Sequence, residues 1–91
     1  MGYENELNAW IEKIKKKMEE KTNNWRFYEI EDLLFMITNE VGNMMIAHLK
    51  QKNNYFYVLG KDFYRAFDNL ATLVFTIQKR RIGYEQNEKD N

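Results

Sequence analysis

Hydrophobic residues recur with helical spacing along three stretches of the chain. In the first stretch, from about Glu4 to Lys21, most positions are charged and the apolar ones form a single stripe: Leu7, Trp10, Ile11, Ile14 and Met18. The next residues, 22–24, are Thr, Asn and Asn, which favour turns over helix. The pattern predicts one amphipathic helix that ends before residue 22.

The second stretch runs from about Phe27 to Lys52. Six residues in alternating steps of four and three form a seam with a period of 3.5: Ile30, Leu34, Ile37, Val41, Met44 and His48. Further apolar residues flank this seam, so the helix is apolar on more than one face. We therefore expect it to be the central helix, surrounded by others.

The third stretch starts between Leu59 and Asp62 and continues to about Arg81. It repeats the same spacing at Phe63, Phe67, Leu70, Val74, Ile77 and Arg81. Matching seams joined by a short link predict an antiparallel hairpin. We expect the core to contain two residues from each seam, namely Leu34, Val41, Phe67 and Leu70.

These elements predict an all-α fold, a small antiparallel helical bundle of three main helices. The chain has no Pro and only four Gly, so little interrupts the helices. We expect one domain over residues 1–82 and a flexible polar tail over 83–91. The segment 55–58 is strand-like in composition and is expected to be an extended segment or the first turn of the third helix. The apolar second helix predicts a homo-oligomer, either a dimer or a tetramer.

Composition removes several classes of function. Lys plus Arg and Asp plus Glu both number 14, and without a basic excess we expect neither DNA binding nor membrane binding. The absence of Cys excludes disulfides and thiolate sites, and the single His excludes sites that need two imidazoles. No apolar run approaches the roughly 18 residues of a membrane span and the N-terminus lacks the apolar region of a signal peptide, so we expect a cytoplasmic protein. Eleven Asn and ten Lys suit an AT-rich bacterial or phage genome, or a mobile element.

Two acidic residues stand out beside the seams. Glu40 and Asp68 lie on flanking stripes that could meet near the middle of the hairpin, with three polar neighbours around them: Asn39, Asn43 and Arg65. Carboxylates from neighbouring helices are the beginning of a metal site. A separate basic cluster, residues 79–81, is expected in the last turn of the third helix, where cations favour the helix dipole.

The segment 38–43, TNEVGN, preceded by LLFMI, resembles the metal-binding helix of the MazG-type nucleotide pyrophosphohydrolases, an all-α family. That family carries EExxE, often EEVGE, on one helix and ExxD on a later one. Here NEVGN stands at 39–43 and RAFD at 65–68. By itself, NEVGN is equally a helical stretch with a tolerated Gly and two solvated Asn.

Matched to the family's motifs position by position, this chain retains two of the five acids, Glu40 and Asp68. Asn39, Asn43 and Arg65 stand at the other three positions. The resemblance implies Mg²⁺ held by the two acids in an active member. The three replacements instead imply a pseudo-site, in which Arg65 pairs with the carboxylates without metal.

Three functional hypotheses follow. The first is a MazG-like bundle that has lost hydrolysis and binds a nucleotide or a protein partner. The second is an active Mg²⁺-dependent pyrophosphohydrolase that uses Glu40 and Asp68, with further acids such as Glu29, Glu31 or Asp32 from a neighbouring subunit. The third is an unrelated helical interaction protein or inhibitor that docks through exposed aromatic residues: Tyr28, Tyr55, Phe56, Tyr57 and Tyr64.

Overall fold

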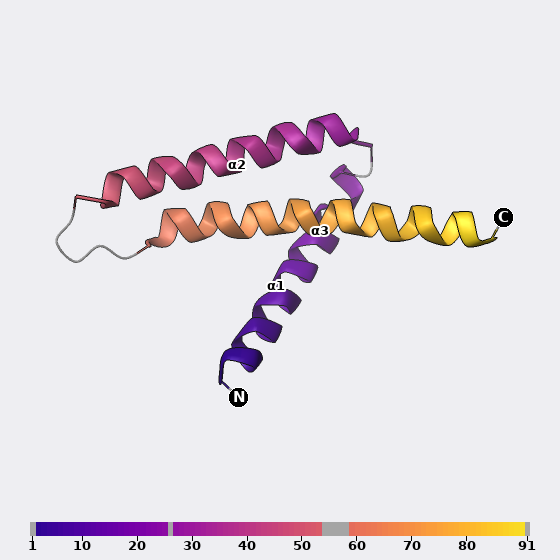
Figure 1. Ribbon diagram of the computed structural model, residues 1–91, viewed down its shortest axis with the longest axis horizontal. Helices are drawn as coiled ribbons and strands as arrows, with labels where there is room; N and C mark the ends of the chain where they lie inside the picture. The colour runs from indigo at the N-terminus through magenta and orange to yellow at the C-terminus, as the bar shows by residue number, and fades with distance from the viewer. Residues whose placement is uncertain (1, 26, 54–58, 91) are drawn as a thin grey trace.

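The computed structural model of the chain describes residues 2–25, 27–53 and 59–90, and all three of its elements are helices. They are α1 (Gly2–Trp25), α2 (Ile30–Gln51) and α3 (Lys61–Asp90). In Figure 1, α2 and α3 run antiparallel side by side, and α1 crosses α3 at a steep angle. The predicted all-α hairpin architecture is confirmed.

The helix ends differ from the predicted ones. α1 continues through residues 22–24 to Trp25, and α3 continues past Arg81 to Asp90. The basic cluster at 79–81 is therefore not in the last turn of α3, and that prediction is wrong. The boundary predicted at residue 82 falls inside a helix, whereas the flexibility of the tail stays a prediction. The segment 54–58 lies outside the described residues.

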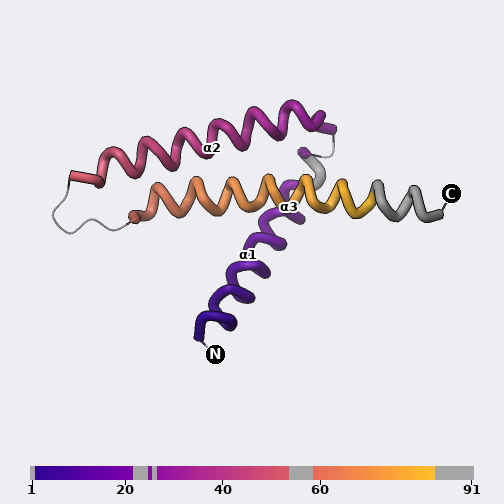
Figure 2. Tube along the Cα trace, in the orientation of Figure 1, coloured from indigo at the N-terminus to yellow at the C-terminus, as the bar shows by residue number. Residues whose placement is uncertain are grey.

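The central helix is α3, not α2 as the sequence predicted. Both α1 and α2 pack along α3, and Trp25 at the end of α1 joins the core cluster that contains Leu33 of α2. Figure 2 traces this arrangement, with the N-terminal half of α1 leading away from the hairpin.

The core lies one residue away from the predicted seams. Leu33 of α2 and Leu73 of α3 are 0% and 2% exposed and form one cluster with Trp25, while Ile14 of α1 is also fully buried. Three of the four predicted core residues are exposed instead: Leu34 (51%), Val41 (50%) and Phe67 (37%). The fourth, Leu70, is half-buried. These seam residues therefore face outward, whereas Ile37 and Ile77, also on the predicted seams, pack against the core cluster.

Polar contacts close the connection between α1 and α2. The Trp25 carbonyl accepts a hydrogen bond from Arg80 Nη2 at 2.8 Å and another from the Tyr28 backbone N–H at 3.0 Å. At the start of α2, the Asp32 carboxylate accepts a hydrogen bond from the Glu29 N–H at 2.9 Å. These contacts satisfy backbone groups that a helix end leaves without a partner.

Candidate functional site: a polar groove between three helices

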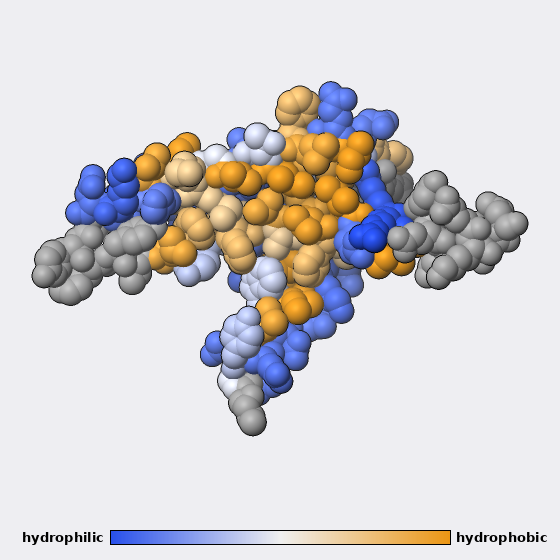
Figure 3. All heavy atoms as spheres, viewed as in Figure 1, coloured by the Kyte–Doolittle hydropathy of each residue, from blue (hydrophilic) through white to orange (hydrophobic). Residues whose placement is uncertain are grey.

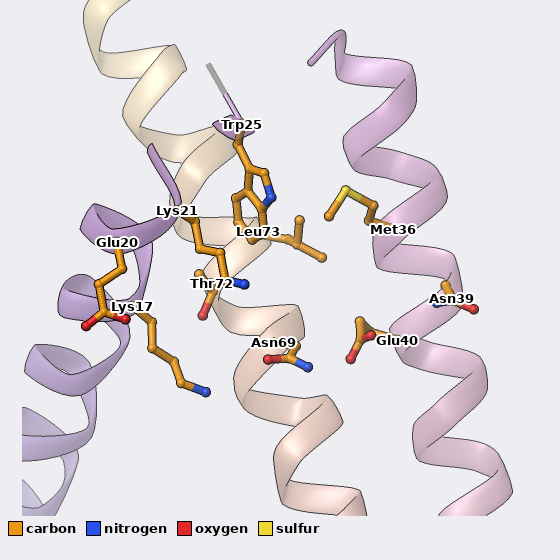
Figure 4. A pocket seen from close by; sticks show the side chains of 10 residues that line it. All are labelled: Lys17, Glu20, Lys21, Trp25, Met36, Asn39, Glu40, Asn69, Thr72 and Leu73. Atoms are coloured by element: carbon orange, nitrogen blue, oxygen red, sulfur yellow. The ribbon is translucent and has the colours of Figure 1, made fainter. Parts of the chain in front are cut away.

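Glu40 projects from α2 into a groove that all three helices line. The groove has a cavity volume of about 340 Å³, and α3 forms its floor (Figure 4). The lining residues are Lys17, Glu20, Lys21, Trp25, Met36, Asn39, Glu40, Asn69, Thr72 and Leu73. We refer to this set as the polar groove. Its size falls within the range of small-molecule sites, which begin at about 300 Å³.

The carboxylate of Glu40 retains capacity to accept hydrogen bonds. Its Oε1 accepts one from Asn43 Nδ2 at 3.4 Å. Its Oε2 is buried and accepts none from any described residue. Because buried polar atoms are nearly always hydrogen-bonded, this oxygen is suited to a donor other than the described residues, such as a ligand.

The cationic side of the polar groove comes from α1. Lys17, Lys21 and Trp25 follow one another at intervals of four residues, so they lie on one face of that helix. Lys21 Nζ lies 5.9 Å from the centroid of the Trp25 ring, within the range of a cation–π interaction. In Figure 4, Lys17 and Lys21 reach toward the space between α1 and α2. Neither lysine was predicted as a site residue from the sequence, although their four-residue spacing was a usable signal.

Asp68 lies elsewhere, against α1. Its Oδ1 accepts a hydrogen bond from Trp10 Nε1 at 2.8 Å, and its Oδ2 is 3.3 Å from Lys13 Nζ. The Trp10 ring stacks on Phe67 with centroids 5.6 Å apart and meets the edge of Phe75 at 6.4 Å. Asp68 therefore joins α1 to α3 and does not line the polar groove. The predicted pocket shared by Glu40 and Asp68 is wrong.

Arg65 lies near Glu40 without completing the predicted ion pair with Asp68. It lines a second, smaller groove of about 250 Å³ together with Glu40 and Asn43. Arg65 Nη1 is 3.6 Å from Asp62 Oδ1, one turn earlier on α3. Of the other predicted site residues, Asn39 lies in the polar groove, whereas Tyr64 is 49% exposed and contacts Phe63 and Phe67 edge-on. Tyr55, Phe56 and Tyr57 are outside the described residues.

The donor set does not fit the Mg²⁺ that the MazG resemblance implies. Magnesium requires several hard oxygen ligands in octahedral geometry. Glu40 and Asp68 face different helices, and over residues 2–25, 27–53 and 59–90 no three Asp, Glu, His or Cys side chains gather as a metal site would need.

Comparison of the chain with known proteins found no similar protein. No family model, no curated protein and no solved structure matches this chain. Across the described residues, none of the helices combines the length and apolar character needed to span a membrane. The chemistry of the polar groove is therefore the guide to function.

Proposed function

We propose that this chain is a MazG-like helical bundle that has lost metal-dependent pyrophosphohydrolase activity and acts as a binding or regulatory protein. Its ligand is an anionic small molecule that occupies the polar groove. A nucleotide is the first candidate for this ligand. Such a role suits a cytoplasmic protein of bacterial, phage or mobile-element origin.

The observation that carries this proposal is that Lys17 and Lys21 line the α1 side of the polar groove while the Glu40 carboxylate lines the α2 side. Glu20 is the second acid of the lining. Lys17 and Lys21 offer ammonium groups to a phosphate or carboxylate. Glu40 Oε2 and the amides of Asn39 and Asn69 offer acceptors and donors to the remainder of the ligand. A groove of this composition can orient a nucleotide without a metal ion.

The contacts of the remaining acids disfavour the active alternative. Asp68 is engaged by Trp10 and Lys13, so ligation of Mg²⁺ would require it to leave α1. Asp32, suggested as a ligand from a neighbouring subunit, accepts a hydrogen bond from the start of its own helix. Moving either carboxylate to a metal ion would break these hydrogen bonds and lose the free energy that they contribute.

A thermal melt tests the proposal directly. Nucleoside triphosphates are added in EDTA and, separately, with Mg²⁺ or Mn²⁺. A ligand at 100 times its Kd should add about 2.7 kcal/mol, which raises Tm by several degrees in a domain of this size. We expect the same shift in EDTA as with metal.

Matched variants locate the binding. Lys17→Ala and Lys21→Ala should reduce the nucleotide-induced shift. Lys15→Ala should not, because Lys15 is exposed and pairs with Glu12 at 3.4 Å on its own helix. A shift that appears only with metal and disappears in Glu40→Gln would instead favour the active enzyme.

A second candidate is a helical protein-interaction module. It is favoured by the exposed apolar residues of α2, which include Phe35 at 68% and Ile46 at 53% exposure. Exposed apolar surface of this kind marks interaction sites. If no nucleotide shifts the melting temperature under any condition, this candidate replaces the first.

A further inference from the structure

Several residues of the predicted seams of α2 and α3 are exposed, and they lie on the same side of the hairpin. On α2 the buried Leu33 is followed by the exposed Leu34, and on α3 the buried Leu73 is followed by the exposed Val74. One residue is a rotation of about 100° around a helix. Because the two helices are antiparallel, the same rotation away from their contact brings both seams to the same side of the hairpin.

The result is one apolar surface that spans two helices. In Figure 3 hydrophobic residues gather over α2 and α3 across the middle of the face shown. Its exposed members are Ile30, Leu34, Val41, Met45 and Leu49 of α2, with Phe67 and Val74 of α3. We call this set the hairpin face. Asn39 and Asn69, which line the polar groove, lie on the other side of the hairpin.

The exposed area of the chain exceeds that of a compact fold of its size. A folded protein of 11.1 kDa ordinarily exposes about 5,700 Å². This chain exposes 7527 Å². Its radius of gyration is 16.0 Å, against about 12 Å for a compact domain of this length. Part of this excess exposed area comes from the N-terminal half of α1, which projects from the hairpin. Another part comes from the apolar residues of the hairpin face.

The excess is large enough to include a homodimer interface. It is about 1,800 Å² on each chain, or about 3,600 Å² for two chains, of which the projecting half of α1 accounts for part, and obligate homodimers bury roughly 2,000–5,000 Å². The 3.5-residue period of the seams is the spacing that packs helices against helices in bundles. A second hairpin face offers that same period and the same apolar character.

We propose that the hairpin face is the interface with a second copy of this chain. The two hairpins pack face to face about a two-fold axis, so that α2 and α3 of both copies form a four-helix core. The interface uses one surface twice, as two-fold symmetry requires. This inference does not depend on the proposed nucleotide binding, because the polar groove is on the opposite side.

The test is the mass of the protein in solution, measured by light scattering during size-exclusion chromatography over a range of concentrations. We expect twice the chain mass of 11.1 kDa. Leu34→Glu and Val41→Glu place unpaired charges in the interface and should weaken the dimer at least about 100-fold. Asn39→Glu adds the same charge on the other side of α2 and should leave the mass unchanged.

Circular dichroism of each variant reports whether the helices remain. If either glutamate variant loses them, Val41→Ser replaces it as the milder change, and the wild-type mass still decides the proposal. If the wild-type protein is a monomer at all concentrations, the proposal is wrong and the hairpin face binds a different partner. A dimer insensitive to changes at residues 34 and 41 also overturns it, because its interface would then lie elsewhere.

Discussion

The indole N–H of Trp10 donates a hydrogen bond to Asp68 Oδ1 at 2.8 Å and links α1 to α3 across 58 positions of sequence. The second carboxylate oxygen is 3.3 Å from Lys13 Nζ. The side chain of Asp68 is only 13% exposed, so it depends on these partners for the hydrogen bonds that water would otherwise supply. The acid expected to bind metal thus holds α1 in place.

Trp10→Phe should destabilise the protein by about 1–3 kcal/mol. The substitution keeps an aromatic ring at the position but removes the N–H, which leaves a mostly buried carboxylate oxygen without its donor. Urea denaturation measures the loss. Lys13→Ala is the control and should cost no more than about 1 kcal/mol, because the Lys13 side chain is 60% exposed. Equal small losses in both variants would contradict a structural role for the indole.

Leu33→Ala should cost about 2–5 kcal/mol of unfolding free energy, because Leu33 is fully buried against Trp25 and Leu73 and truncation leaves a cavity. Leu34→Ala, one position further, opens no cavity within the chain. Its effect should instead vary with protein concentration, since it acts on the proposed dimer. Urea denaturation at two protein concentrations distinguishes the effect of Leu33→Ala from that of Leu34→Ala. A concentration-independent loss at Leu34 equal to that at Leu33 would restore the predicted core.

Gly42→Ala should stabilise the protein by about 0.5–1 kcal/mol. Gly42 lies inside α2, and a Cβ built there meets no atom within 4 Å. Alanine is better than glycine in a helix because the unfolded chain loses less freedom on folding. Ala47→Gly is the reverse change at a buried position of the same helix and should destabilise by at least as much. Destabilisation by Gly42→Ala would show that another group packs on this glycine.

Arg80→Gln should destabilise the C-terminal end of α1. Arg80 Nη2 donates to the Trp25 carbonyl at 2.8 Å, and α1 has no basic residue of its own in its last turn. Loss of this charged hydrogen bond should cost about 1–2 kcal/mol and speed amide exchange near residue 25. Lys79→Ala, at an exposed neighbouring position, should change stability by less than about 0.5 kcal/mol. Unchanged exchange in Arg80→Gln would contradict the capping role.

The helices could be predicted from the sequence, because a period near 3.5 identifies them whatever they pack against. The surface against which each apolar stripe packs could not be predicted. The stripe that contacts α3 contains Leu33 and Ala47 but also Glu40, and a carboxylate in its middle makes it look polar. The more apolar stripe with Leu34 and Val41 therefore looked like the core. A sequence pattern shows which residues favour burial, and a second copy of the chain can supply that burial as well as a neighbouring helix.

The end of α3 was missed for a similar reason. Beyond Gly83 no apolar stripe remains, yet Glu, Gln and Lys are good helix formers and continue the backbone hydrogen bonding. For the site, the sequence pointed to Glu40 and Asn39, which line the polar groove. It did not reveal Lys17 and Lys21, because the crossing of α1 over α3 that brings them there is set by contacts such as Trp10 with Asp68.

Calorimetric titration of a nucleoside triphosphate tests the central claim most directly. The titration is run in EDTA and in Mg²⁺, and the cell contents are assayed afterwards for pyrophosphate. We predict binding of similar affinity in both buffers, weakened in Lys17→Ala, with no pyrophosphate above the protein-free blank. Pyrophosphate released only in Mg²⁺, and abolished by Glu40→Gln, would contradict the account and identify an active pyrophosphohydrolase.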